Sequence, residues 1–153
     1  MRIVLDTTIL VEIERRNEDA INLIKNLIAG DHVIIISMAT VSEVLTGSYM
    51  RRDFSKAVTT AKQIMGQFLW TDIDGSVAEK TAQYIAYLIA EGKMIEYPDV
   101  VIAATFKIEG ADYLLTLNKA HFENIPDLEG KVFAPKEFLL KFSGVLITKG
   151  KSK

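Results

Sequence analysis

The hydrophobic positions along the chain alternate between two kinds of segment. Three short runs are almost continuously apolar, which is typical of strands buried on both faces: RIVLD at 2–6, HVIIIS at 32–37 and DYLLT at 112–116. A further strand is expected at 69–73. Elsewhere apolar residues recur every three or four positions, which predicts amphipathic helices. Strands alternating with helices predict an α/β fold with a mainly parallel central sheet.

Glycine residues mark several of the expected helix ends. Gly30, Gly92 and Gly110 each follow a helical pattern and suit the left-handed residue that ends a helix. Further helices are expected from the SMATVSEVLTGSY segment, over 53 to about 68, and over 134–142. We expect one domain over residues 1–142 and a partly disordered, basic tail over 143–153.

Composition narrows the class of protein. The chain has 153 residues, 49% of them hydrophobic, which suits one domain with a real core. It has no cysteine, which excludes disulfides and a thiol nucleophile, and with only two histidines we do not expect a histidine-rich metal site. No apolar run approaches the roughly 20 residues that span a bilayer, so we expect a soluble cytoplasmic protein without membrane contact. A net charge of −2 argues against wrapping duplex nucleic acid, so a polyanionic substrate would need a local basic patch or bound metal ions.

Four polar side chains fall where strands end or helices begin. Asp6 follows the first strand, and Glu43 lies in the first two turns of the helix after the second strand. Asp99 opens an apolar helix, and Asn118 follows the DYLLT strand. Strand carboxyl ends and the following helix N-termini share one edge of a parallel sheet, where ligands bind. We therefore expect all four in one site.

Gathering three carboxylates predicts a metal ion. Two unit charges about 4 Å apart repel by roughly 4 kcal/mol at an effective dielectric near 20. A divalent cation removes that repulsion, and hard oxygen ligands suit Mg²⁺ or Mn²⁺. Such an ion lowers the pKa of bound water and polarises a phosphoryl group. The reaction class that follows is phosphodiester hydrolysis.

Each of these residues also has a purely structural interpretation. Asp6 could form an Asx-turn at the strand end. Thr40 and Glu43 spell the capping box TVSE. Asp99 could simply complement the helix dipole, and Asn118 could occupy a left-handed turn. Only a shared position at one sheet edge favours the site.

In order and spacing, four segments resemble the PIN domain, and specifically VapC-type toxin ribonucleases. They are IVLDTTIL with Asp6, SMATVSEVLTG with Glu43, YPDVVIAATF with Asp99 and LLTLNKAHFENI with Asn118. The resemblance implies a three-layer α/β/α fold and an Mg²⁺- or Mn²⁺-dependent endoribonuclease, generally a homodimer inhibited by an antitoxin. The family's acidic ligands map onto Asp6, Glu43 and Asp99. Its fourth position, often aspartate and sometimes asparagine, is Asn118 here, which puts a second metal ion in question because an amide carries no charge.

The resemblance also implies that Thr7 and Thr116 are the small hydroxyl residues that the family places near the site. From the sequence itself, His121 is a candidate for proton donation or phosphate binding, with packing or capping as the alternative. Arg51 and Arg52 lie beside Tyr49, a combination that suits single-stranded RNA, although it also suits a solvated helix start.

Two other functions remain open. One is an aspartyl phosphotransfer domain with Asp6 as nucleophile, although Thr8 stands where the dehalogenase-like pattern needs a second aspartate. The other is a non-catalytic PIN-like module that binds RNA or protein. Asn118 keeps that possibility open.

Overall fold

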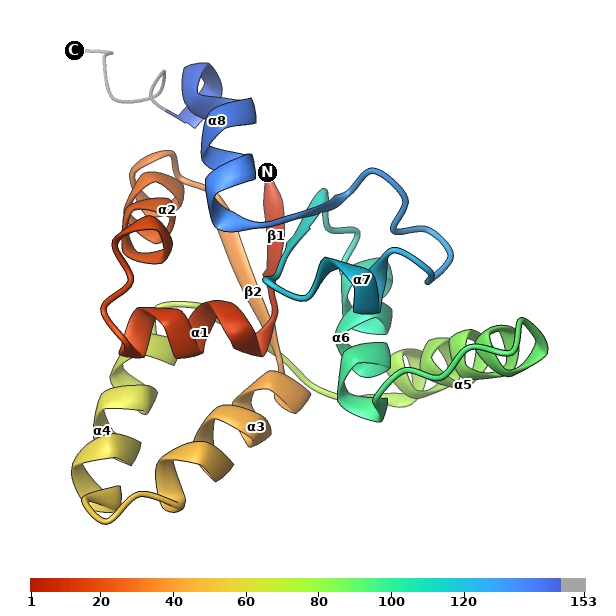
Figure 1. Ribbon diagram of the computed structural model, residues 1–153, viewed down its shortest axis with the longest axis horizontal. Helices are drawn as coiled ribbons and strands as arrows, with labels where there is room; N and C mark the ends of the chain where they lie inside the picture. The colour runs from red at the N-terminus through yellow and green to blue at the C-terminus, as the bar shows by residue number, and fades with distance from the viewer. Residues whose placement is uncertain (147–153) are drawn as a thin grey trace.

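The computed structural model describes residues 1–146 and places one sheet between two layers of helices (Figure 1). The strands run in the order β3-β2-β1-β4-β5, and every neighbouring pair is parallel. Their bounds are β1 Arg2–Leu5, β2 Val33–Ser37, β3 Leu69–Thr71, β4 Tyr113–Leu115 and β5 Val132–Phe133. The predicted parallel sheet is confirmed.

The apolar strand runs reflect burial on both faces of the sheet. In β1, Ile3 and Leu5 pack into one hydrophobic core while Val4 packs into the other. β2 repeats the pattern, with Ile34 and Ile36 on one side and Ile35 on the other. Successive side chains of a strand point to opposite faces, so two cores require an unbroken apolar run.

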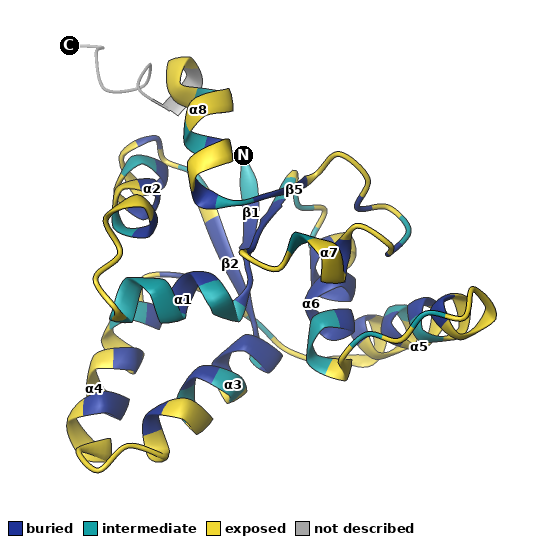
Figure 2. Ribbon diagram, viewed as in Figure 1, coloured by how far each residue is buried: buried dark blue, intermediate teal, exposed yellow. Residues whose placement is uncertain are grey.

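Helices cover both faces of the sheet and complete the expected three layers. One face carries α1 Thr7–Glu14, α2 Glu18–Ala29, α3 Met38–Tyr49, α4 Phe54–Met65 and α8 Pro135–Leu146. The other carries α5 Gly75–Ala90, α6 Tyr97–Ile108 and α7 Lys119–Phe122. Most helices bury one side and expose the other, as Figure 2 shows. No helix in the described part of the chain is long and apolar enough to cross a membrane.

Helix α6 departs from this amphipathic pattern because it is the most enclosed helix. All residues from Val100 to Phe106 are buried, whereas the first turn, with Pro98 and Asp99, is only partly buried. Proline suits a first helical turn, and a carboxylate there complements the helix dipole. The apolar helix therefore presents one charged end at the sheet edge.

Some local predictions need correction. Gly30 ends α2 with φ −83°, so it is not the left-handed residue; Asp31 is, with φ 54°. A Cβ at position 30 would lie 2.7 Å from His32 Nε2, so a larger residue there would require the imidazole to shift. By contrast, Gly92 and Gly110 do have positive φ, as expected.

The chain ends also differ in detail. β5 was not predicted, and α8 continues to Leu146, so the expected boundary at residue 142 falls inside a helix. The remainder of the predicted tail, residues 147–153, lies outside the described residues.

Candidate active site

The four polar residues singled out from the sequence line one cavity of about 300 Å³ at the carboxyl edge of the sheet. Asp6 directly follows β1, Glu43 stands on α3 after β2, and Asp99 lies in the first turn of α6. Asn118 lies just beyond β4. The complete lining is Asp6, Thr7, Thr8, Glu43, Glu96, Pro98, Asp99, Asn118 and His121. Residues far apart in sequence thus meet as the parallel-sheet argument requires.

Asp6 is the most rigidly held of the carboxylates. It is 2% exposed, and its Oδ2 accepts hydrogen bonds from Thr8 Oγ1 at 2.6 Å and Thr116 Oγ1 at 2.7 Å. The same oxygen lies 3.4 Å from Thr8 N, which makes Asp6 the N-cap of α1. Among the described residues nothing donates to Oδ1. The Asx interpretation is therefore correct, yet it leaves one oxygen for a ligand.

The two threonines tie the next loop to Asp6. Thr8 Oγ1 accepts from Leu117 N at 3.0 Å, and Thr116 Oγ1 accepts from Asn118 N at 2.9 Å. Each hydroxyl therefore accepts from the backbone and donates its single proton to the carboxylate. This arrangement fixes where Asn118 enters the cavity.

Glu43 is held by Thr7, whose Oγ1 donates to Glu43 Oε2. Burial raises the pKa of Glu43; the Thr7 hydrogen bond opposes this, and repulsion from neighbouring carboxylates adds to it. The capping-box interpretation is wrong: α3 is capped by Ser37, and Thr40 is buried within the helix.

Asp99 is paired with His121. The Nδ1 atom of the imidazole lies 2.7 Å from Asp99 Oδ2, and His121 is half exposed while the carboxylate is largely covered. Burial is the main cause that raises the pKa of Asp99; the His121 hydrogen bond lowers it, and Asp6 and Glu96 raise it further.

The remaining predicted residues are placed differently. Thr116 lies beneath the cavity, fully buried, where it holds Asp6. Asn118 has φ −104°, so the left-handed interpretation is wrong. Arg51 pairs with Asp53 at 3.0 Å, beyond the end of α3 that is opposite the cavity, and Arg52 is its exposed neighbour. The structure does not bring these arginines into the site.

Two polar lining residues were missed by the sequence reasoning. Thr8 was considered only as a departure from another family's pattern. Glu96 adds a fourth carboxylate; it occupies the N-cap position of α6, but its side chain makes no capping hydrogen bond. A signal for Glu96 was available, because it lies just before the Pro98-Asp99 helix start.

The donor set fits a hard divalent cation. Four carboxylates and an amide line the cavity, no lysine or arginine does, and the pKa of both Glu43 and Asp99 is raised. The described histidine, aspartate and glutamate side chains contain no ready-made group of three metal ligands. Mg²⁺ does not need one, because it commonly uses one or two carboxylates and keeps several waters.

A parallel sheet of order 3-2-1-4-5 with acidic side chains at its carboxyl edge defines an α/β fold with a candidate acidic metal site. The sequence profile of the PIN domain matches residues 3–128. The chain therefore belongs to the PIN domain family. No curated protein sequence matches the chain.

Solved structures with the same fold support this assignment. The chain is similar to VapBC2 from Rickettsia felis bound to a promoter DNA fragment, with TM-score 0.79, 22% identity, and 88% of this chain and 98% of that one covered. FitAcB from Neisseria gonorrhoeae gives TM-score 0.73, 28% identity, and coverage of 88% and 98%. VapC20 from Mycobacterium tuberculosis, a Sarcin-Ricin loop cleaving toxin, has a TM-score of 0.55 and 16% identity, with 73% of this chain and 86% of that one covered.

Proposed function

We propose that this chain is a metal-dependent endoribonuclease of the VapC type, the toxin of a toxin–antitoxin pair. The observation that carries the proposal is the single cavity that joins Asp6, Glu43 and Asp99 from three separate elements. Neither fold stability nor helix capping requires these carboxylates to converge. The convergence opposes folding, because the pKa of two of them is raised by burial and mutual repulsion.

Asp6, Glu43 and Asp99 would hold Mg²⁺ or Mn²⁺, directly or through water, with Asn118 offering an uncharged oxygen. When bound, such an ion lowers the pKa of water and neutralises charge on a phosphoryl group. The cavity lining has no lysine or arginine to attract a phosphate. Approach of RNA therefore depends on that neutralisation.

The chain's own residues set the positions of these ligands. Thr8 and Thr116 hold Asp6 Oδ2, which leaves Oδ1 without a donor among the described residues. Thr7 orients Glu43, and His121 orients Asp99. Such supporting contacts matter because losing one commonly costs 10–100-fold in metal affinity or activity. His121 acts here as a positioning residue.

Glu96 compensates for the uncharged Asn118. It lines the same cavity and raises the pKa of both Glu43 and Asp99. The side chain takes part in no ion pair among the described residues, so its charge is available to a cation. The site retains four carboxylates although the fourth position of the family pattern carries an amide.

The partners follow from the family. Similar solved structures include a toxin-antitoxin complex from Klebsiella pneumoniae and VapBC-5 from Mycobacterium tuberculosis, a member of the VapBC family of toxin-antitoxin systems. We extend that arrangement to this chain as a homodimer bound by an antitoxin. Its substrate is RNA in the cytoplasm. A non-catalytic PIN-like module remains the second candidate, because Asn118 removes one charge from the site.

The test is cleavage of a mixed structured RNA pool by the purified chain, checked for a copurified second protein. With Mn²⁺ or Mg²⁺ the wild type should cut internally, whereas Asp6→Asn and Asp99→Asn should lose the activity. Lys62→Ala, on α4 and away from the cavity, serves as control. Cleavage that survives EDTA, or equal activity in wild type and both asparagine variants, would refute the catalytic assignment.

A further inference from the structure

Helix α5 carries two rows of mostly apolar side chains, and the described part of the chain covers only one of them. The helix packs chiefly against α6 and lies at the side of the molecule in Figure 1. The buried row is Val77, Thr81, Tyr84 and Leu88. The exposed row is Ala78, Ala82, Ala86 and Ile89, which share another face because they recur every three or four positions. The outward side of an amphipathic helix carries polar residues, so this row indicates a surface that another molecule covers.

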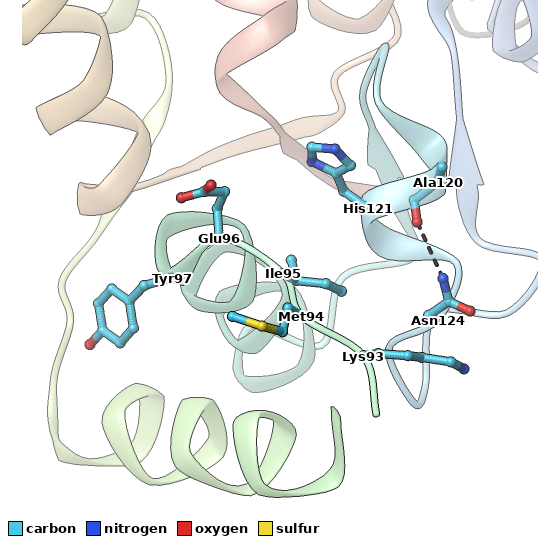
Figure 3. A pocket seen from close by; sticks show the side chains of 8 residues that line it. All are labelled: Lys93, Met94, Ile95, Glu96, Tyr97, Ala120, His121 and Asn124. Atoms are coloured by element: carbon cyan, nitrogen blue, oxygen red, sulfur yellow. Dashed lines mark hydrogen bonds between the residues drawn. The ribbon is translucent and has the colours of Figure 1, made fainter. Parts of the chain in front are cut away.

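The exposed row continues into an apolar cavity of about 160 Å³ between the end of α5 and the start of α6. Its lining is Ile85, Leu88, Ile89, Lys93, Met94, Ile95, Tyr97 and Val100. Three of these side chains project into solvent: Ile89 is 69% exposed, Met94 98% and Tyr97 59%. In Figure 3 the side chains of Met94 and Tyr97 point away from Lys93 and Asn124. The exposed row together with Met94 and Tyr97 is called the α5 face below.

The α5 face is large enough for a stable contact. At roughly 200 Å² for a large side chain, the exposed parts of Ile89, Met94 and Tyr97 together amount to roughly 450 Å². That is more than half of the roughly 800 Å² that each partner contributes to a standard interface, and the alanine row adds to it. Single exposed apolar residues are normal on a monomer, whereas one continuous patch of this size is typical of an interaction site.

The α5 face is complementary to itself in the sizes of its side chains. The small residues lie in the first part of the span from Ala78 to Met94, and the large ones follow its middle residue, Ala86. Two copies related by a twofold axis at Ala86 run their α5 helices antiparallel, so each Met94 lies over the partner's Ala78. The small side chains let the two helices approach closely, and the large ones fill the space at both ends. A closed pair therefore buries the whole face in a single contact.

We propose that a second copy of this chain docks on the α5 face through an antiparallel contact between the two α5 helices. The inference rests on the proposed function for the homodimer and deepens it by assigning the surface. An antitoxin is the alternative occupant. Because the α5 face contains no charged side chain, it offers an unlike partner no charge to match, whereas its sizes match those of its own copy.

The contact adjoins the acidic cavity. Met94 and Tyr97 lie on either side of Glu96 in the sequence, and Glu96 lines the acidic cavity. A further cavity of about 490 Å³, drawn in Figure 3, connects the two regions, because it shares Tyr97 with the apolar cavity and Glu96 with the acidic one. A docked copy therefore covers side chains before and after Glu96 and stands beside the acidic cavity.

Sedimentation equilibrium of the full chain at micromolar concentration tests the surface. The wild type, checked by mass spectrometry to contain no second protein, should be a dimer. Ile89→Glu should raise the dimer Kd at least about tenfold, because two carboxylates would be buried without partners near the twofold axis. Leu140→Glu is the matched control, since Leu140 is 73% exposed on α8, on the other side of the sheet, and this variant should dimerise as wild type does. Far-UV circular dichroism checks that both variants fold.

Single cysteines test the antiparallel arrangement, because the chain itself has none. Ala86→Cys places two thiols near the twofold axis, and mild oxidation should link them into a covalent dimer on a non-reducing gel. Ala78→Cys is the control on the same exposed row. Its two copies would lie roughly 24 Å apart along the antiparallel helices, beyond the reach of a disulfide.

The inference is overturned if the wild type is monomeric, with or without affinity for an antitoxin. It is also overturned if Ile89→Glu and Leu140→Glu dimerise equally, or if Ala78→Cys is linked as readily as Ala86→Cys. Cleavage of RNA is a separate readout. A dimer that forms through the α5 face but cuts no RNA in Mn²⁺ refutes the proposed ribonuclease and supports the interface, whereas a monomeric wild type that cuts RNA refutes the interface alone.

Discussion

Thr116 Oγ1 lies 2.7 Å from Asp6 Oδ2, joining the ends of the neighbouring strands β4 and β1. Both side chains are almost fully buried. The same hydroxyl accepts from Asn118 N, so one threonine connects a buried carboxylate to the loop that carries the fourth site residue. The position of Asp6 is thus built into the sheet rather than into a flexible loop.

Thr116→Val should destabilise the protein by about 1–3 kcal/mol, because Asp6 loses a buried donor while the volume is nearly kept. Denaturant unfolding measures this. Thr105→Val is the matched control: Thr105 is also fully buried, but its hydroxyl donates to a helix carbonyl, that of Val101. An equal loss of unfolding free energy in Thr116→Val and Thr105→Val would contradict this prediction.

Glu43→Gln should stabilise the metal-free protein at pH 7. The folded-state pKa of Glu43 is raised above 4.5, so the folded protein binds the proton more tightly than the unfolded chain does. The free energy of unfolding therefore falls as pH rises from about 4.5 through the folded-state pKa. The gain should not exceed about 1 kcal/mol, since the side chain is only half buried and water screens the repulsion.

Glu137→Gln should change the free energy of unfolding in the direction opposite to that of Glu43→Gln. The pKa of Glu137 is lowered by the Ala134 N–H and by Lys119, so its charge favours folding and the variant should lose stability at pH 7. Thermal unfolding in EDTA at pH 4 and pH 7 compares the two variants. Destabilisation of both at pH 7 would contradict the repulsion ascribed to the acidic cavity.

His121→Ala should raise the pKa of Asp99 further. Burial already raises that pKa, and the hydrogen bond from His121 opposes the effect. Carboxyl chemical shifts of Asp99 followed by NMR over an acidic titration measure the change. Lys119→Ala is the control, because Lys119 pairs with Glu137 and not with Asp99. An unchanged Asp99 pKa in His121→Ala would show that the imidazole does not stabilise the carboxylate.

Asn118→Asp should tighten Mn²⁺ binding by about tenfold, because charge count sets the affinity of oxygen-ligand sites. The metal-free variant should also be less stable, since another carboxylate joins the repulsive group. Cleavage rate against Mn²⁺ concentration reports the first effect. If the half-saturating concentration is the same for Asn118→Asp and wild type, position 118 does not contact the ion.

The sequence predicts the parts of this structure that depend on regular patterns. The apolar runs predicted β1, β2 and β4. Because strand carboxyl ends share one edge of a parallel sheet, the sequence then predicted that Asp6, Glu43, Asp99 and Asn118 lie together. β5 escaped prediction because Val132–Phe133 is too short to show a period. Its place in the sheet is set by pairing with β4, which is tertiary information.

The supporting contacts were less predictable. Thr8 and Glu96 acquire their roles only from where their side chains lie relative to Asp6 and Asp99, which no spacing rule specifies. Arg51 failed as a site residue for the same reason. It lies on the same segment as Glu43 but beyond the other end of α3, roughly 12 Å away along the helix axis, and is paired with Asp53.

Isothermal titration calorimetry with Mn²⁺ at pH 7 tests the central claim most directly, namely that the carboxylates of the acidic cavity jointly hold a divalent cation. Wild type should bind at least one ion per chain, and Asp6→Asn and Asp99→Asn should each weaken that binding by at least about tenfold. Glu129→Gln, outside the cavity, should bind as wild type does. No heat of binding in folded wild type, or equal affinity in all four proteins, would contradict the claim.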